Sequence, residues 1–446
     1  MTMSVIRTLV AVALLLVVIV PASPVVASRD KQIIRVGLLA NQQSVIVSAD
    51  AAFVIMADGD RKVAVLAAKE RAVIAIKDGQ LTINGTVEKT QTLRFEAANP
   101  QSELISEVNR KRYRGIITVL RTSKYPGLTV VNTIGVEPYL CGIIAGEISP
   151  DWPMEAVKAQ AVAARTYALY SIGKHGDEGY DVCATTDCQV YGGVGSEAPR
   201  AIKAVDETKG LVLQYNGRLI PAYFHSSGGG YTENSENVWS SALPFIRGVP
   251  DFDQQSPHYR WTKEYKPSEL NLLLEKAGFG IGELQAITLS RLDKQPVNAS
   301  DRGISGRVKT IRLTGAKGSV MLNGNKFRSL LGLSSTLFDI AVMMPPPPAI
   351  EVPMTDSYGD HGQKKIDVNL KPTERKSTFL DQDNIHRITN KQQEKVVISG
   401  YGYGHGLGLS QWGAKAMAEK AKPDDAAYFQ QILKHYYQGV NMVKLY

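Results

Sequence analysis

One long helical pattern lies between two stretches of short β-like runs, and this order restricts the fold of the chain more than any other feature. We expect a helix over residues 152–170, because Asp151 and Pro153 stand at its start. The small residues that recur on one face of this segment are Val157, Ala161, Ala164 and Ala168. Such side chains permit close helix packing. Because β-like runs precede and follow the helix, the sequence predicts an α+β protein.

The stretch before this helix is rich in short strand patterns. Examples are residues 33–39 and 72–83, and the second of these is interrupted by Asp78 and Gly79, a pair typical of hairpin turns. We therefore predict a small β-rich N-terminal domain over residues 30–124. It contains no cluster of chemically active residues, so we expect it to act as a spacer or a docking module.

A mixed α/β domain is predicted over residues 125–344. Residues 345–395 then begin with four consecutive prolines and contain few aliphatic side chains, so we expect a polar, extended or disordered insertion there. Apolar and helical patterns return over residues 396–446. Because those helical segments need a core to pack on, we expect this tail to fold back onto the mixed α/β domain and complete it.

The N-terminal residues 1–27 have the pattern of a secretory signal. Arg7 precedes an apolar stretch over residues 9–20, and small residues follow up to Ala27. An uncleaved membrane anchor is the alternative, since a tilted segment of this length can reach across a bilayer. In both cases the sequence predicts an exported protein, located in the periplasm or at the outer face of the cytoplasmic membrane.

The composition agrees with a globular exported protein. Of the 446 residues, 44% are hydrophobic, which is enough for a large core and two or more domains. The net charge of +8 is spread along the chain without a long basic block, which argues against a nucleic-acid partner and allows a mild attraction to anionic envelope polymers. Three cysteines are too few for a disulfide scaffold, so stability must come mainly from the core.

Glu147 is predicted to lie on the apolar face of a short helix. Pro138 suits the first turn of that helix, and Leu140, Ile144 and Glu147 then fall on one stripe. Apolar surroundings and a nearby helix C-terminus both disfavour an ionised carboxylate, so we expect a raised pKa for Glu147. A carboxyl group that stays protonated near neutral pH can act as a general acid. The alternative is a structural ion pair between Glu147 and Arg165.

Two glycine-rich motifs are candidates for binding a sugar. The first, residues 224–233, contains His225, two serines and three glycines, and it can place hydrogen-bond donors and bare backbone against a ligand. The second, residues 400–408, alternates glycine with other residues around His405. It lacks the context of a phosphate loop, so we expect its backbone to pass close to another strand or to a long ligand. Tight turns without a ligand are the alternative for both motifs.

A third candidate site contains two cysteines. Cys183 and Cys188 enclose a short polar loop, and His175 lies upstream of them. Two thiols and an imidazole can bind zinc. A disulfide between the two cysteines is the alternative in an exported protein, and it would leave Cys141 as a buried free thiol. Both alternatives stay open at this point.

A series of motifs in this chain occurs in the same order in one known family. They comprise residues 136–140, 146–147, 155–167, 188–193, 224–229 and 404–414. On these motifs the chain resembles the stage II sporulation protein D (SpoIID/LytB) family from residue 125 to residue 446, apart from the insertion. The resemblance implies a lytic transglycosylase that cuts peptidoglycan glycan strands, preferentially strands stripped of stem peptides, with Glu147 as the catalytic acid. Some members hold zinc near Cys183, although a histidine often found before the second cysteine is Asp187 here.

The resemblance also implies a mechanism that requires no cofactor. Glu147 protonates the oxygen that bridges N-acetylmuramic acid (MurNAc) and N-acetylglucosamine (GlcNAc), and its carboxylate then takes the proton of the muramic C6 hydroxyl, which closes a 1,6-anhydro ring. One carboxyl group suffices for this route, whereas ordinary glycosidases use two. The candidates for binding the sugar are Arg165, Tyr167, Gln189, Tyr191, His225, Ser226, Ser227 and His405. The alternative function is a non-catalytic, peptidoglycan-binding enhancer of an N-acetylmuramoyl-L-alanine amidase.

Overall fold

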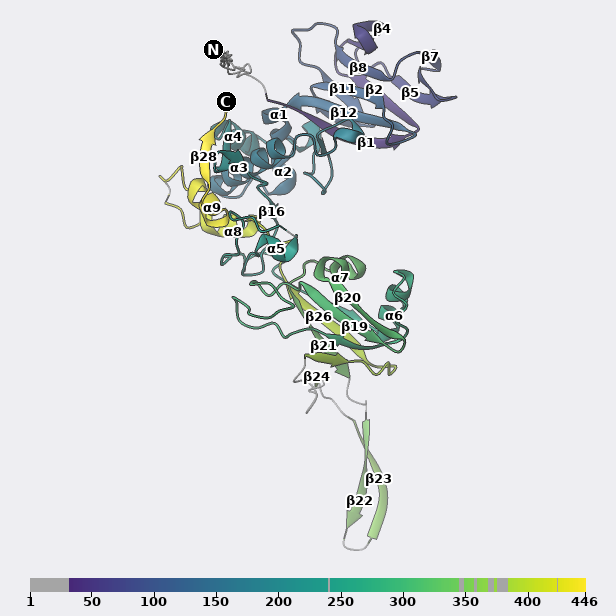
Figure 1. The fold of residues 1–446 in the computed structure, drawn as a ribbon, viewed down its shortest axis with the longest axis vertical. Helices are drawn as coiled ribbons and strands as arrows, with labels where there is room; N and C mark the ends of the chain where they lie inside the picture. Colours follow the sequence, from purple (N-terminus) through teal and green to yellow (C-terminus); the bar gives the residue numbers. More distant parts are fainter. Residues whose placement is uncertain are drawn as a thin grey trace, which may run out of the picture.

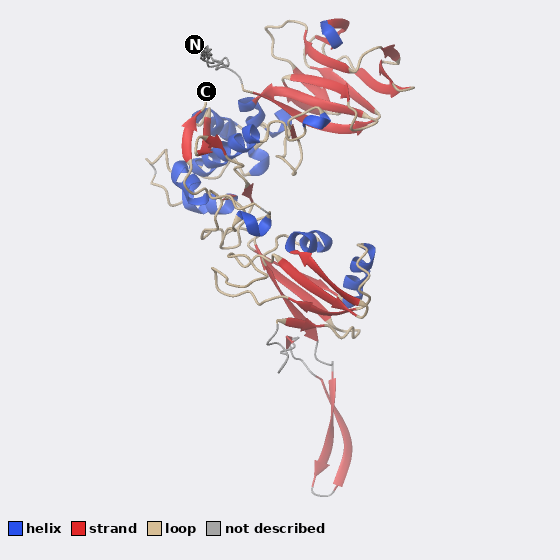
Figure 2. Cartoon of the chain, viewed as in Figure 1, coloured by secondary structure: helices blue, strands red, loops and turns tan. Residues whose placement is uncertain are grey.

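The protein has a β-rich N-terminal region followed by regions that mix helices and strands (Figures 1 and 2). The computed structural model describes residues 32–239, 241–344, 349–356, 359–367, 373–374, 384–422 and 424–446. The predicted signal or anchor over residues 1–27 lies outside these ranges. Within them, none of the helices is long and apolar enough to pass through a membrane. The predicted α+β class is confirmed.

Two sheets form the N-terminal region. The seven-stranded sheet has the order β13-β1-β12-β11-β8-β3-β4. Its strands are β1 (Ile33–Gln42), β3 (Phe53–Ala57), β4 (Arg61–Leu66), β8 (Thr92–Ala97), β11 (Ile116–Arg121), β12 (Leu128–Gly135) and β13 (Val182–Cys183). The six-stranded sheet has the order β10-β9-β2-β5-β6-β7. Its strands are β2 (Ser44–Ala49), β5 (Ala72–Lys77), β6 (Gln80–Ile83), β7 (Thr86–Glu88), β9 (Ile105–Val108) and β10 (Lys111–Arg114).

Alternating side chains explain why these strands form a core. Every second residue of β3 is buried, beginning with Phe53, and the rings of Phe53 and Phe95 lie 6.2 Å apart in the interior. This period of two is the signature of a strand with one buried face. β13 comes from much later in the chain and pairs in parallel with β1, which joins Val182 to Val36. The N-terminal sheet thereby holds one strand from the region that follows it.

The helical region is built around α3 (Met154–Tyr170), which confirms the helix predicted over residues 152–170. The predicted face, which includes Val157 and Ala161, belongs to the same hydrophobic core as the N-terminal sheets. The opposite face, which includes Ala159 and Val162, contributes to a second core. The remaining helices and strands of this region before the tail are α1 (Val136–Cys141), α2 (Ile144–Glu147), α4 (Pro199–Glu207), β14 (Leu211–Tyr215) and β15 (Arg218–Leu219). The short helix η3 (Gly193–Ser196) precedes α4.

The C-terminal tail packs on the second face of α3. Its helices α8 (Gln411–Ala418) and α9 (Phe429–Tyr436) both contact α3, and the last strand β28 (Asn441–Lys444) pairs with β14. Leu433 of α9 is fully buried in the same core as Ala159. The chain therefore returns to the helical region after a long excursion, as the yellow and teal segments of Figure 1 show.

The excursion forms a third region with its own hydrophobic core. One sheet has the order β17-β26-β21-β24 and the other β20-β19-β18-β25. The strands are β17 (Arg260–Tyr265), β18 (Leu284–Thr288), β19 (Thr310–Gly315), β20 (Gly318–Asn323), β21 (Phe338–Met344), β24 (Thr373–Glu374), β25 (Ile385–Arg387) and β26 (Lys395–Tyr401). The helices are α6 (Pro267–Lys276) and α7 (Gly324–Leu331), whereas the short helix α5 (Ser235–Val238) precedes them and packs on the second core through Val238. α7 and α6 lie beside these sheets (Figure 1).

Part of the predicted insertion forms regular structure. Strands β22 (Ala349–Asp356) and β23 (Gly359–Asp367) pair in antiparallel fashion and extend away from the rest of the molecule (Figure 1). Ile350 and Val352 alternate with other residues in this segment, which is a short strand pattern. β24 and β25, also from this segment, each pair with a strand of the third region.

A short parallel pairing brings the two glycine-rich motifs together. β16 (Phe224–His225) pairs with β27 (Leu409–Ser410), and Ser227 forms a bridge with Tyr403. Gly404, the residue after Tyr403, has φ +109°, and a Cβ atom there would stand 2.9 Å from the Cβ of His225. Only glycine combines this backbone conformation with so close an approach. The expectation that the backbone of residues 400–408 passes close to another strand is confirmed.

Candidate active site

A cavity of about 1110 Å³ lies where the two glycine-rich motifs meet α2 and the end of α3. Six of the residues singled out in the sequence line it. They are Glu147, Tyr167, Cys188, His225, Ser226 and His405. The structure therefore collects, on one surface, residues that are spread over more than half of the chain.

Glu147 is the last residue of α2 and projects a half-buried carboxyl group to the cavity wall. Its Oε1 accepts a hydrogen bond from the backbone N–H of Val190 at 3.3 Å. Burial raises the pKa of Glu147, and this outweighs the opposing hydrogen bonds from Val190 and the side chain of Gln411. The predicted direction of the pKa shift agrees with the structure.

The predicted single helix through Glu147 is wrong in its geometry. The chain forms two short helices, α1 and α2, instead of one, although Pro138 lies in the first turn of α1 as expected. The break occurs at Gly142, where a Cβ atom would lie 2.6 Å from the ring of Tyr191. Because α2 has only four residues, its dipole contributes little, and burial is the main cause of the raised pKa of Glu147.

The alternative in which Glu147 pairs with Arg165 is also wrong. Arg165 is fully buried and forms a two-pronged ion pair with Glu137, at 2.7 Å and 2.9 Å. The same carboxylate accepts hydrogen bonds from the backbone N–H of Gly210 and the hydroxyl of Tyr446. Arg165 therefore ties α3 to α1, and it takes no part in the cavity wall. No ion pair among the described residues involves Glu147.

Three other predicted sugar-binding residues are also occupied by contacts with the protein. The hydroxyl of Tyr191 donates to Asn132 at 2.9 Å, and the side chain of Gln189 bridges the hydroxyl of Tyr139 and the carbonyl of Ala164. The hydroxyl of Ser227 donates to the buried carboxylate of Asp253. These side chains stabilise the walls from behind, and none of them lines the cavity.

Two neutral histidines stand side by side in the cavity wall, with ring centroids 5.4 Å apart. Nδ1 of His225 contacts the carbonyl of Leu407 at 3.1 Å, and because a carbonyl only accepts, this nitrogen carries the proton. Nδ1 of His405 accepts from the N–H of Leu407 at 3.0 Å. Burial lowers the pKa of His405 to about 3 and that of His225 well below its ordinary value. Both rings are therefore neutral at physiological pH and serve as hydrogen-bonding groups rather than acids.

Aromatic rings and two cations complete the cavity. The ring of Tyr223 lies 6.0 Å from Tyr167 and 4.5 Å from Trp239, and Trp239 lies 5.1 Å from His405. Further lining residues lie outside the two glycine-rich motifs and were not assigned to the site by the sequence analysis, and they include Tyr170, Lys174, Tyr223, Trp239, Arg328 and Gln411. Gln411 stands in the motif over residues 404–414 and could have been assigned from it. Trp239 and Arg328 lie outside every recognised motif.

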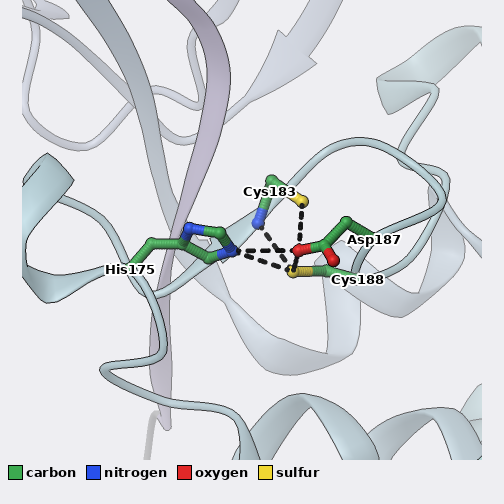
Figure 3. Close-up of side chains that lie close together, drawn as sticks. All are labelled: His175, Cys183, Asp187 and Cys188. Atoms are coloured by element: carbon green, nitrogen blue, oxygen red, sulfur yellow. Dashed lines mark hydrogen bonds and ion pairs between the residues drawn. The ribbon is translucent and has the colours of Figure 1, made fainter. Parts of the chain in front are cut away.

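The cysteine site borders the same cavity. Donor atoms of His175, Cys183, Asp187 and Cys188 all lie within 4.8 Å of one another (Figure 3). Nε2 of His175 is 3.4 Å from both the thiol of Cys188 and the carboxylate of Asp187. The three predicted ligands therefore meet in space, and Asp187 joins them. Both thiols are free, and a hydrogen bond from Cys188 lowers the pKa of Cys183.

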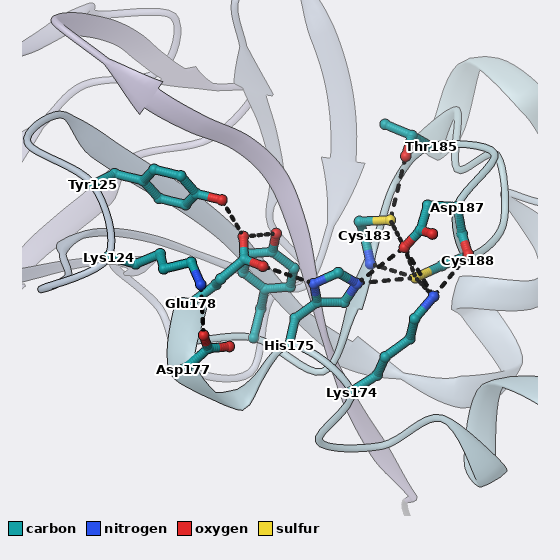
Figure 4. A network of polar contacts seen from close by, with 11 residues as sticks. Lys124, Tyr125, Lys174, His175, Asp177, Glu178, Cys183, Thr185, Asp187 and Cys188 are labelled. Atoms are coloured by element: carbon teal, nitrogen blue, oxygen red, sulfur yellow. Dashed lines mark hydrogen bonds and ion pairs between the residues drawn. The ribbon is translucent and has the colours of Figure 1, made fainter. Parts of the chain in front are cut away.

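A second layer of polar contacts orients these donor atoms (Figure 4). The carboxylate of Glu178 accepts from Nδ1 of His175 at 2.9 Å and from the hydroxyls of Tyr125 and Tyr180, each at 2.7 Å. These bonds lower the pKa of Glu178 to about 2. A carboxylate on Nδ1 leaves Nε2 with its lone pair facing the cluster, which is the usual arrangement behind a metal-binding histidine. On the other side, Lys174 donates to Asp187 at 2.8 Å.

Comparisons with known proteins match two separate segments of the chain, and both contribute residues to the cavity. Residues 124–215 match the family described as stage II sporulation protein, and they include Glu147 and the whole cysteine site. Residues 233–351 match a domain of unknown function (DUF8618), and they include Trp239 and Arg328. The cavity is therefore lined by residues from two separately recognised segments.

Three relatives illustrate the similarity. An uncharacterized protein of Brachyspira hyodysenteriae is 31% identical over 320 residues, which cover 71% of this chain and 68% of that protein. The amidase enhancer of Bacillus subtilis is 28% identical over 83% of this chain, which corresponds to only 49% of the enhancer. Stage II sporulation protein D of Bacillus amyloliquefaciens is 28% identical over 73% of this chain and 78% of that protein. The chain belongs to the stage II sporulation protein D (SpoIID) family.

Proposed function

We propose that this protein is an exported enzyme that cleaves peptidoglycan glycan strands by lytic transglycosylation, with Glu147 acting first as general acid and then as general base. The observation that carries the proposal is the state of Glu147. Its carboxyl group is half-buried at the wall of a large cavity, lacks a cationic partner among the described residues, and has a raised pKa. A raised pKa favours the protonated form of the carboxyl group, which is the form that a general acid requires.

The rest of the cavity supports a route that needs one carboxyl group. Among the described residues, Asp187 is the second carboxyl group that lines the cavity, and the hydrogen bond from Lys174 lowers its pKa. Because Asp187 is paired with Lys174, it does not serve as the second carboxylate that glycoside hydrolysis requires. Intramolecular attack by a sugar hydroxyl dispenses with that second group, because the nucleophile already belongs to the substrate.

In the proposed reaction, the proton of Glu147 passes to the oxygen that links C1 of MurNAc to GlcNAc, and the bond from C1 to that oxygen breaks. The resulting carboxylate takes the proton of the C6 hydroxyl while O6 bonds to C1. Glu147 thus ends protonated, and the product carries a 1,6-anhydro-MurNAc end. The N–H of Val190 and the side chain of Gln411 stabilise the carboxylate between the two steps. Aromatic faces such as those of Tyr223 and Trp239 provide surfaces for sugar rings.

We also propose that His175, Cys183, Asp187 and Cys188 bind zinc. The donor set fits this metal, because two thiols, an imidazole and a carboxylate are all common zinc ligands. Four protein ligands make a closed site, and closed zinc sites are structural. Bound zinc would hold the loop between the cysteines, which leads directly to Val190 and hence to the N–H that contacts Glu147. A disulfide between Cys183 and Cys188 would restrain the same loop.

A second candidate function is a non-catalytic enhancer of a cell-wall amidase. The relative named amidase enhancer, which aligns with 83% of this chain, supports it. Two assays separate these functions: mass spectrometry of purified glycan strands after incubation with the protein, and an amidase assay with and without the protein. Anhydro-MurNAc ends that depend on Glu147 support the enzyme. If amidase activity rises with the protein present and no anhydro ends form, the enhancer is correct.

A further inference from the structure

Arg328 is a cation at the wall of the cavity. It lies in the last turn of α7, and its Nε donates to the carbonyl of Leu333 at 3.2 Å, just beyond the left-handed Gly332 that ends the helix. This bond anchors the guanidinium through one nitrogen. Among the described residues, no carboxylate forms an ion pair with Arg328. Lys174, on another wall of the same cavity, is by contrast paired with Asp187 at 2.8 Å.

The surroundings of Arg328 make its positive charge unfavourable in the protein without a ligand. The side chain is half-buried, and burial lowers its pKa, which means that its charge is incompletely solvated. Tyr403 and the neutral His405 line the same part of the cavity, and Arg328 itself helps to lower the pKa of His405. The buried guanidinium of Arg307 is a second cation that acts on Arg328 and on His405, so the half-buried charge of Arg328 is destabilising unless a ligand supplies the counter-charge. The planar guanidinium, with two nitrogens not engaged by Leu333, is suited to a carboxylate.

We propose that Arg328 binds the lactyl carboxylate of a MurNAc residue whose stem peptide has been removed. This inference rests on the proposed function, because it takes peptidoglycan glycan as the occupant of the cavity. In that glycan, GlcNAc has no carboxyl group, and MurNAc carries one on its lactyl ether. A stem peptide converts this carboxyl group to a neutral amide. Arg328 therefore makes the cavity selective for MurNAc over GlcNAc and for stripped strands over peptide-bearing strands.

The proposal also gives the third region of the fold a role. Arg328 and Trp239 both belong to the segment that matches the domain of unknown function, whereas Glu147 belongs to the segment that matches the stage II sporulation protein family. The segment that matches the domain of unknown function recognises the substrate, and the segment that matches the stage II sporulation protein family performs the chemistry. Specificity and catalysis are thus placed on different parts of the chain.

The test is equilibrium binding by calorimetry, with every variant made in full-length Glu147→Gln protein so that no probe is cleaved. Three tetrasaccharides serve as probes: alternating GlcNAc and MurNAc with free lactyl groups, the same strand with stem peptides, and a tetramer of GlcNAc. We expect Arg328→Gln to weaken binding of the first probe by about tenfold or more, because a hydrogen-bonded charge pair is lost. Binding of the GlcNAc tetramer should not change. Lys326→Gln is the matched control, since it removes one exposed positive charge from the same helix and should leave all three affinities unchanged.

Arg328→Lys covers the case in which the glutamine variant does not fold, as judged by its melting temperature. It keeps the charge but not the planar fork, so it should retain part of the preference for the stripped strand. Equal discrimination by Arg328→Gln and its parent overturns the proposal, and so does an absence of measurable binding. A loss confined to the peptide-bearing strand overturns it too, because the carboxylate would then belong to the peptide. If Arg328→Gln loses the preference for the stripped strand but protein with Glu147 intact forms no anhydro ends, the role of Arg328 stands and the proposed reaction fails. If anhydro ends form and Arg328→Gln discriminates as well as its parent, the proposed reaction stands and the role of Arg328 fails.

Discussion

Glu147→Gln isolates the proton that the proposed reaction transfers. The amide has the size and shape of the carboxyl group, and its oxygen can still accept the hydrogen bond from the N–H of Val190. What the variant loses is a group that donates a proton and later takes one back. General acid–base catalysis is typically worth about 10²–10⁴-fold in rate, and a single residue serves both steps here. The rate of anhydro-MurNAc formation should therefore fall by about 10⁴-fold or more.

The same substitution should not weaken the fold. Glu147 has a higher pKa in the folded protein than in the unfolded chain, because burial disfavours the charged form. Such a group destabilises the folded state once the pH exceeds its unfolded pKa. Glutamine removes that penalty, so the melting temperature at pH 7 should be equal to that of the wild type or higher. For the wild type, cleavage should decline as the pH rises through the raised pKa of Glu147, since the acid must be protonated.

The assay is mass spectrometry of products from purified glycan strands over a range of pH, together with a thermal melt of each protein. A glutamine variant that produces anhydro ends at nearly the wild-type rate would refute the assignment of Glu147. A variant that melts early would show that the carboxyl group is structural instead. Asp187→Asn is a useful comparison, because Asp187 is the other carboxyl group of the cavity and should influence the loop rather than the chemistry.

Three further outcomes are expected. Glu137→Gln breaks the buried pair with Arg165 and should destabilise the protein by about 3–5 kcal/mol in chemical unfolding, whereas a loss below about 1 kcal/mol would show that this pair is dispensable. Cys188→Ser should lower zinc content, measured by elemental analysis of protein purified without chelator, and should lower cleavage with it; a wild-type protein with two titratable thiols and no metal would contradict both the zinc site and the disulfide. Deletion of residues 349–367 should leave the melting temperature and the activity unchanged, because among the described strands β22 and β23 pair only with each other; a less cooperative melt would mean that this hairpin stabilises the third region.

The parts of the site that could be predicted from the sequence are those with a local cause. The helix α3 follows from small residues at helical spacing, and the raised pKa of Glu147 follows from its apolar neighbours. Cys183 and Cys188 are close in sequence, and a short loop brings their sulfur atoms together. The motifs over residues 224–229 and 404–414 were recognised as parts of one site through the family resemblance.

The parts that could not be predicted depend on contacts between distant segments. Arg165 could pair with either Glu137 or Glu147 as far as the sequence indicates. In the structure its partner is Glu137, and Glu147 lies in a second helix beyond the break at Gly142. Gln189 and Tyr191 belong to a recognised motif, yet their polar atoms face Tyr139 and Asn132 in the core. Trp239 and Arg328 reach the cavity because a whole region folds between β16 and β27, and no local pattern indicates where such a region will dock.

The pairing of β13 with β1 limits how this architecture can be rearranged during evolution. β13 ends at Cys183 and pairs in parallel with a strand from the beginning of the described chain. The N-terminal region therefore cannot be replaced by an unrelated domain, because the new domain would need a strand in the same position to pair with Val182. A lineage that lost this region would leave the edge of the cysteine loop without its hydrogen-bonding partner. Inheritance of the two regions as one unit is the simplest expectation, even though their sequences suggest separable modules.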